Sequence, residues 1–161
     1  MIDNHIMGSF HCIQAVLPVM RRQPRGDIHL MSSTHARILP QGLLSYAVAK
    51  AGLEALGLCL AKEERSHNIR VNTISPTTVP SGQSAGFPAS IGMSNFEEVG
   101  KYIPFGRVVL PEDIGDLCVF LASEEGSRIS GQVISVDASL GPESVREFVS
   151  REAQKRQRSA T

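Results

Sequence analysis

The sequence predicts a single α/β domain built on a parallel sheet. Short apolar or β-branched segments at 27–32, 69–75 and 131–137 have the length and composition of buried strands. They alternate with helical segments, a long one at 44–65 and a shorter one from Leu110 to Leu121. The order strand, helix, strand, helix, strand is typical of parallel strands with helices on both faces. A chain of 161 residues, 42% of them hydrophobic, can bury a core of that kind.

Two of the predicted helices carry more apolar surface than one sheet can cover. The spacing of apolar residues predicts the first helix over residues 2–22, strained at Pro18. Between residues 47 and 61 the second long helix has only Lys50 and Glu54 as charged residues, and Gly52 and Gly57 are its weak points. A helix that is apolar nearly all round must be covered on several sides. We therefore expect the helix at 44–65 to face both its own sheet and another subunit.

Two segments lack this regularity. Residues 77–105 contain several Pro and Gly without a steady period, and a loop of that length in a compact domain is usually a lid or disordered. Residues 142–161 carry five basic and three acidic side chains and a short apolar stripe of Val145, Phe148 and Val149. We expect this partly basic tail to be an amphipathic helix that frays into solvent.

Composition argues against several classes of partner. The 16 basic and 16 acidic side chains balance, so nothing favours binding to nucleic acid. No uninterrupted apolar run reaches the ~20 residues of a membrane span, and residues 1–5 do not resemble a signal peptide. Cys12, Cys59 and Cys118 are too far apart for a metal knuckle and too few for a disulfide framework. The sequence thus predicts a soluble, cytoplasmic protein without a metal site.

The chemistry concentrates in residues 31–52. Tyr46 and Lys50 stand four apart on a predicted helix and so share one face. A phenol loses its proton only near pH ~10, but an adjacent ammonium favours the phenolate, and such a tyrosine can exchange a proton with a substrate oxygen. Ser33 follows the first strand, at the edge of the sheet where ligands gather, and its hydroxyl can hydrogen-bond the reacting oxygen. Oxidation of an alcohol would also need a hydride acceptor, which no side chain supplies.

These residues belong to a longer ordered pattern. Ser33, the Tyr-x-x-x-Lys motif at 46–50 and the segments 69–76, 105–113, 120–123 and 131–137 together resemble the second half of a short-chain dehydrogenase/reductase. The resemblance runs from about residue 2 to residue 137. It implies the corresponding half of a Rossmann-like, doubly wound parallel sheet over residues 1–141, with 77–105 as the variable substrate lid.

The resemblance also implies a function. It implies reversible hydride transfer between NAD or NADP and a small-molecule secondary alcohol or ketone, with Tyr46 as general acid/base. Lys50 would hold the nicotinamide ribose, and Ser33 would orient the substrate oxygen. It further implies that Pro76, Thr77, Val79 and Ser81 contact the nicotinamide end, and that Phe87, Met93, Phe96 and Tyr102 form an apolar cover. Helices 2–22 and 44–65 match the family's paired dimer helices, which implies a homo-oligomer.

At several positions the sequence departs from the family pattern. Aligning residues 5–10 with the family's Asn-x-x-Gly-x-Phe puts His5 where a catalytic asparagine usually sits, with Asn4 one residue away. Histidine can donate, accept and titrate, so His5 either takes part in the proton relay or is a tolerated helix residue. Thr77 and Ala138-Ser139 stand where glycines are common, and we expect their β-carbons either to narrow the approach of the backbone or to exclude positive φ. His35, just past Ser33, could reach the substrate, but we expect it to be a solvated loop residue.

The family's TGxxxGxG phosphate-binding motif has no counterpart in the sequence. Three interpretations follow. The chain starts near the middle of a family domain and carries its catalytic half, or it is a non-catalytic module that acts only in association, or a separate chain supplies the missing half.

Overall fold

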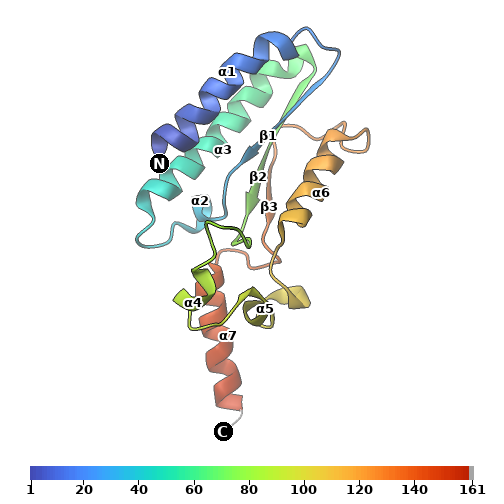
Figure 1. Cartoon of the computed structure of the whole chain (residues 1–161). Coiled ribbons are helices and arrows are strands. Elements are labelled where there is room, and N and C mark those ends of the chain that lie inside the picture. Colours follow the sequence, from blue (N-terminus) through green and yellow to red (C-terminus); the bar gives the residue numbers. More distant parts are fainter. Residues whose placement is uncertain (160–161) are drawn as a thin grey trace.

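The computed structural model describes residues 1–159 and confirms the α/β class. One parallel sheet has the strand order β1 (Gly26–Met31), β2 (Ile69–Pro76), β3 (Val133–Val136). Helices α1 (Gly8–Met20) and α3 (Leu44–Glu64) lie on one face of this sheet and α6 (Pro111–Ala122) lies on the other (Figure 1). Strand β3 begins two residues later than predicted because Gly131 is left-handed, with φ +68°.

The first helix is not uniform. A single helix over 2–22 was predicted, but a π-helical turn, η1 (Asp3–Met7), precedes the α-helix α1 (Gly8–Met20). The Gly8 N–H donates to the Asp3 carbonyl, the five-residue spacing of a π-helix. Ile13 and Leu17 of α1 are buried with Leu30 and Val71 of the sheet. The π-helical turn carries His5, one of the predicted site residues.

Helix α3 (Leu44–Glu64), extended by the 3-10 turn η2 (Arg65–His67), packs directly on the sheet. A β-carbon at Gly57 would collide with the Thr73 hydroxyl and crowd Leu30, so the glycine permits the close approach of α3 to β2. Gly52 in the same way accommodates Ile6. The two predicted weak points of the helix are therefore its packing contacts.

By length and mean hydropathy, the helical segment Leu44–His67 could cross a membrane. The same composition suits a core helix of a soluble protein. Here Ala49, Leu53 and Leu60 are buried, and Lys50 and Glu64 are buried polar residues of the same helix. Packing against the sheet accounts for part of the apolar composition, whereas Val48 and Leu58 of the same helix stay exposed.

Strand β2 is buried on both faces, although its sequence alternates. It is the central strand, so its polar side chains also lie inside. Asn72 is satisfied there: its amide donates to the Ile129 carbonyl at 2.9 Å and its oxygen accepts the Gln132 N–H at 3.1 Å.

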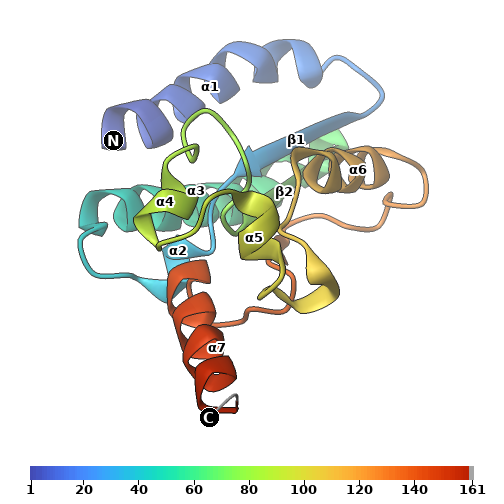
Figure 2. The same ribbon diagram turned by 60° about the horizontal axis from the view of Figure 1, so that its bottom comes forward.

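The segment 77–105 and the C-terminal helix form a second packed region beyond the carboxyl ends of the strands (Figure 2). The segment contains the short helices α4 (Phe87–Ser90), α5 (Phe96–Gly100) and the 3-10 turn η3 (Pro104–Gly106). Helix α7 (Val145–Ser159) packs its first turns against it. We call the buried residues of this region the lid cluster, namely Val99, Ile103, Val108, Leu140, Val145 and Val149.

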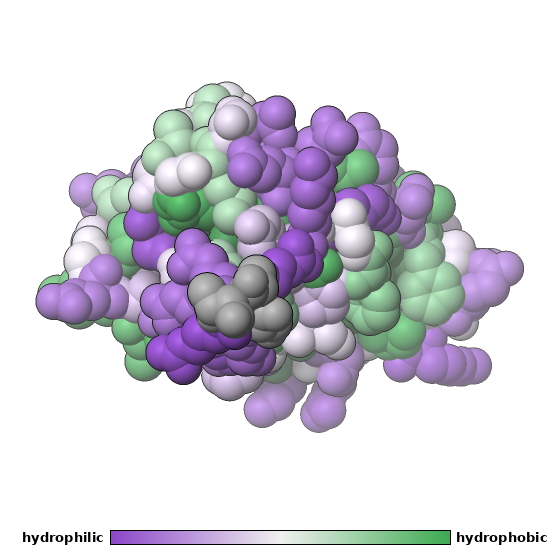
Figure 3. Space-filling view, turned by 90° about the horizontal axis from the view of Figure 1, so that it is seen from below, coloured by the Kyte–Doolittle hydropathy of each residue, from purple (hydrophilic) through white to green (hydrophobic). Residues whose placement is uncertain are grey.

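The predicted amphipathic helix in the tail is thus present from residue 145. The apolar stripe is buried at Val145 and Val149, whereas residues 154–158 are exposed. Seen from below, the surface around this end of the chain is largely hydrophilic, with apolar patches to its sides (Figure 3). Ala160 and Thr161, the last residues of the predicted tail, lie outside the described residues.

Candidate active site

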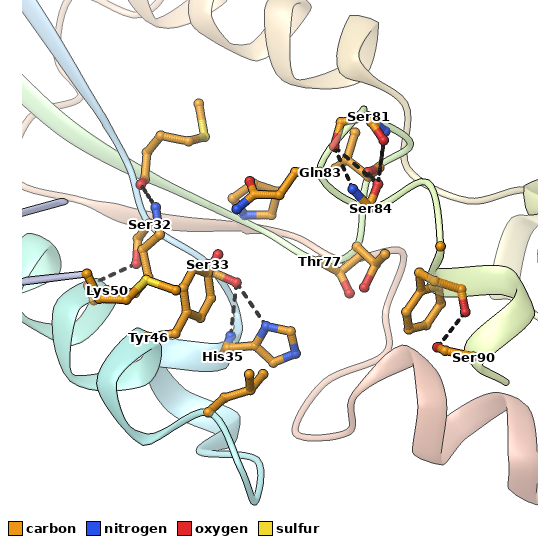
Figure 4. A pocket seen from close by; sticks show the side chains of 18 residues that line it. Ser32, Ser33, His35, Tyr46, Lys50, Thr77, Ser81, Gln83, Ser84 and Ser90 are labelled. Carbon is orange, nitrogen blue, oxygen red and sulfur yellow. Dashed lines mark hydrogen bonds between the residues drawn. The ribbon is translucent and has the colours of Figure 1, made fainter. Parts of the chain in front are cut away.

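The predicted site residues gather around one cavity at the carboxyl ends of the strands (Figure 4). Two backbone hydrogen bonds, Ser32 N to Ile74 O at 2.8 Å and Thr34 N to Pro76 O at 3.0 Å, extend the pairing of β1 and β2 beyond β1 and fix Ser33 between them. The cavity measures about 610 Å³. Its lining includes the following predicted residues: Ser33, Tyr46, Lys50, Pro76, Thr77, Val79 and Ser81.

Lys50 is anchored between Tyr46 and the end of β1. Its ammonium donates a 2.8 Å hydrogen bond to the Met31 carbonyl and lies 5.6 Å from the centre of the Tyr46 ring. The Ser32 hydroxyl donates to the Lys50 carbonyl at 3.1 Å, which ties α3 to the strand end. Burial lowers the pKa of Lys50 from its usual value because it disfavours the charged form. The ammonium is thus held next to the phenol by a carbonyl and by the packing around it.

His35 is part of the site, and its prediction as a solvated loop residue was wrong. It is the first residue of the short helix α2 (His35–Ile38), and its ring lies 6.0 Å from that of Tyr46 in an edge-on contact. Its backbone N–H donates to the Ser33 hydroxyl oxygen at 3.3 Å, and its Nδ1 lies 3.4 Å from the same oxygen. Burial lowers the pKa of His35, opposed by the charge of Glu147. The neutral ring can therefore accept the Ser33 hydrogen.

His5 contacts Tyr46 from the other side. Its ring lies 5.8 Å from the Tyr46 ring, edge-on, whereas Asn4 is exposed. Burial lowers the pKa of His5, and the positive charges of Lys50 and the N-terminus lower it further. Of His5 and Asn4, His5 is therefore the residue that contacts Tyr46, and it does so from outside the cavity, because it is not among the lining residues.

The glycine replacements have different outcomes. Thr77 lies at the end of β2 with its N–H bonded to the Val136 carbonyl at 3.1 Å, and its φ is not positive. Ala138 and Ser139, in contrast, adopt φ +53° and +63°. The expectation that their β-carbons would exclude positive φ was wrong. The Asp137 carboxylate accepts the Ser139 N–H at 3.0 Å and supports this left-handed turn.

Most of the residues predicted to form an apolar cover over the site do not line the cavity. Phe87 lines the cavity, but Met93, Phe96 and Tyr102 pack against the lid cluster. Polar lid residues that the sequence did not single out line the cavity in their place: Thr78, Gln83, Ser84 and Ser90. Serine hydroxyls fix part of this loop, since the Ser84 Oγ donates to the Val79 carbonyl at 2.6 Å. Among residues 1–159, no group of three His, Cys, Asp or Glu side chains could hold a metal ion.

Ser33 at the carboxyl edge of a parallel sheet, with Tyr46 and Lys50 on the adjoining helix α3, is the arrangement of a short-chain dehydrogenase. Comparison with known proteins agrees. The family model described as enoyl-(acyl carrier protein) reductase matches residues 1–140. The chain belongs to the short-chain dehydrogenase/reductase family of NAD(P)-dependent oxidoreductases.

Individual relatives define how far the similarity extends. A 3-oxoacyl-[acyl-carrier-protein] reductase of Thermotoga maritima is 34% identical over 139 residues, which cover 86% of this chain and 55% of that protein. The oxidoreductase UcpA of Salmonella typhimurium is 35% identical over 150 residues, 89% of this chain and 57% of that one. A solved short-chain dehydrogenase/reductase structure from Mycobacterium ulcerans, 26% identical, superposes with a TM-score of 0.76 over 85% of this chain and 49% of that one. The chain spans about half the length of the curated relatives it matches.

Proposed function

We propose that this chain carries the proton-transfer half of an NAD(P)-dependent oxidoreductase that interconverts a secondary alcohol and a ketone. The observation that carries the proposal is the convergence of Ser33, Tyr46 and Lys50 on one cavity from three neighbouring places, the end of β1 and two successive turns of α3. In the reducing direction the phenol of Tyr46 gives its proton to the carbonyl oxygen of the substrate. In the oxidising direction the phenolate takes the proton of the alcohol.

The residues around the cavity fit the nicotinamide end of a cofactor. Pro76 and Val79 offer apolar surface for a ring, while Thr77, Ser81 and the Lys50 ammonium offer hydrogen-bonding groups for ribose hydroxyls and a carboxamide. A bound nicotinamide supplies or accepts the hydride, which no side chain can do. These residues would hold NAD and NADP equally at this end.

Ser33 and the two histidines prepare the proton transfer. The His35 backbone N–H donates to the Ser33 hydroxyl oxygen, and on substrate binding the Ser33 hydrogen would turn from His35 Nδ1 to the substrate oxygen. Lys50 stabilises negative charge on the Tyr46 oxygen, and its bond to Met31 keeps it there. His5, neutral and behind Tyr46, is suited to relay a proton toward solvent.

Replacing Tyr46 with Phe tests the proposal. With a ketone and either NADH or NADPH, we expect the variant to lose at least about 10²-fold in kcat, as is typical when a general acid is removed, and to bind the cofactor as before. Tyr102→Phe is the matched control because Tyr102 packs against the lid cluster and Arg156, away from the cavity.

Tyr46→Phe activity within a few-fold of the parent would eliminate the mechanism. Tight, saturable binding of NADH or NADPH by the unaltered chain would eliminate the alternative, a non-catalytic module that acts in association.

We also propose that the chain self-associates through α1 and α3. Both helices expose apolar side chains away from the sheet, including Val16, Val19, Val48 and Leu58, at 45%, 51%, 48% and 38% exposure. Apolar faces of this kind gain from being covered. Sedimentation equilibrium should give a mass at least twice 17.4 kDa, and Val48→Asp should lower it. A monomer at micromolar concentration would contradict this.

A further inference from the structure

A second cavity adjoins the candidate active site. It measures about 590 Å³ and shares four lining residues with the first, His35, Leu43, Thr78 and Phe87. The shared residues are the wall at which the two cavities meet, and His35, which contacts Ser33, is among them. The two cavities therefore adjoin at His35, next to the Ser33 hydroxyl. We call the second space the distal cavity.

The far wall of the distal cavity comes from two segments outside the catalytic group. One is the loop 40–42 before α3, and the other is Ser144–Glu147 at the start of α7. The family match ends at residue 140, so the α7 wall is a feature of this chain beyond the matched region.

Apolar packing and two hydrogen bonds hold the start of helix α7 against the lid. Val145 and Val149 are 3% and 2% exposed within the lid cluster. The Arg146 guanidinium donates to the Ser90 carbonyl and to the Ser90 hydroxyl, both at 2.9 Å, and so fastens α7 to α4 of the lid. Because Ser90 lines the first cavity, the same contact couples the walls of both cavities.

The charges in the distal cavity are already engaged. Glu147 accepts the backbone N–H and the hydroxyl of Ser144 at 2.9 and 2.8 Å, while Arg146 is bonded to Ser90. One cation and one anion leave no excess charge to hold a charged ligand. The rest of the lining mixes apolar surface from Pro40 with the uncharged amide of Gln41 and the groups shared with the first cavity.

From this arrangement we propose that the distal cavity binds the non-reacting part of the substrate and that the start of α7 limits its size. The substrate class is then a ketone or secondary alcohol with an uncharged extension that has both apolar and hydrogen-bonding groups. This inference rests on the proposed function for the position of the reacting carbon, but not for the existence of the binding site.

The test compares a short and an extended ketone, cyclohexanone and 4-(4-hydroxyphenyl)cyclohexanone, titrated into the full 15N-labelled chain with NADH present. Both compounds should shift the amide signals of Ser33 and Tyr46. Only the extended compound should shift those of Gln41 and Ser144–Glu147. Absence of shifts at α7 with the extended ketone would overturn the inference.

A substitution that fills the distal cavity sharpens the test. Gln41→Trp should weaken binding of the extended ketone at least about tenfold and leave that of cyclohexanone within twofold, because Gln41 lines only the distal cavity. The matched control is Gln23→Trp, at an exposed position that lines neither cavity. Unchanged affinity of Gln41→Trp for the extended ketone would refute the inference.

The two proposals can fail separately. Distal shifts without turnover by NADH or NADPH would retain the distal site and reject the proposed oxidoreductase. Turnover of both ketones without shifts at α7 would retain the oxidoreductase and reject the distal site.

Discussion

The sheet with α1 and α3 and the lid with α7 are held together in different ways. In the sheet region, the central strand β2 is buried along its length between hydrogen-bonded neighbours, and helices pack on its faces. The lid region contains no strand within residues 77–105 or 142–159, and its short helices meet α7 around the lid cluster. In the sheet region, side-chain packing adds to the backbone hydrogen bonds between strands. In the lid region, the elements are held together by side-chain packing without such strand pairing.

The polar contacts of the two regions also differ, because those of the sheet region include a buried carboxylate whereas those that join α7 to the lid are exposed. In the sheet region the Glu64 carboxylate, 2% exposed, pairs with Arg21, and this bond lowers the pKa of Glu64. In the lid region Arg146 and Arg156 reach across to Ser90 and to the Lys101 carbonyl in exposed contacts. Exposed hydrogen bonds of this kind are weakened by competition with water. We therefore expect the lid and α7 to open locally at lower free energy than the sheet.

Matched truncations in the two regions should reveal this difference most strongly. Val149→Ala in the lid cluster and Val71→Ala in β2 each remove two buried methyl groups, which costs about 2 kcal/mol. Amide hydrogen exchange should show that Val149→Ala lowers protection in α5 and α7 while leaving β2 protected. Val71→Ala should instead lower protection across the sheet and the lid alike.

The same exchange pattern in both variants would contradict the expected difference in stability between the lid and the sheet. Equal loss of protection in β2 and α7 for Val149→Ala would mean that the lid and the sheet unfold as one unit. The unaltered chain, measured alongside, provides the reference for each amide.

The same difference explains how much the sequence could predict. The three strands and α3 could be predicted because each is a continuous segment whose hydrophobic period and composition reflect how its own residues are buried. The arrangement of Ser33, Tyr46 and Lys50 follows in turn, since a strand end and a helix face fix where such side chains can lie. The lid gives no such signal. The lid is joined to α7 by the hydrogen bond from Arg146 to the Ser90 carbonyl. These residues are 56 positions apart, so a local sequence pattern cannot predict the contact.

The orientation of the His35 ring could not be predicted from the local sequence. Two residues after Ser33 it could have continued a solvated loop, and only the short helix α2 turns its ring back toward Ser33 and Tyr46. The π-helical turn around His5 is similar, because a helical period does not distinguish it from α-helix. One sequence signal was available for His35, namely its place two residues after Ser33, which follows the first predicted strand.

The left-handed turn after β3 provides the smallest test, at the junction between the two regions. Ser139 is exposed and has φ +63°, a conformation that strains any residue with a β-carbon. Ser139→Gly should relieve that strain and raise the free energy of unfolding by about 0.5 kcal/mol, measured by urea denaturation. Its backbone bond to Asp137 is retained, since the N–H is the donor.

Ser150→Gly is the matched control, because it makes the same replacement at an exposed position inside α7. There the glycine should lower stability by about 0.5 kcal/mol, since it frees the unfolded chain without relieving any strain. If the two variants change stability in the same direction, the turn at Ser139 is not strained. Opposite signs would show that the connection from β3 into the lid region is held in place against its own backbone preference by the packing on either side.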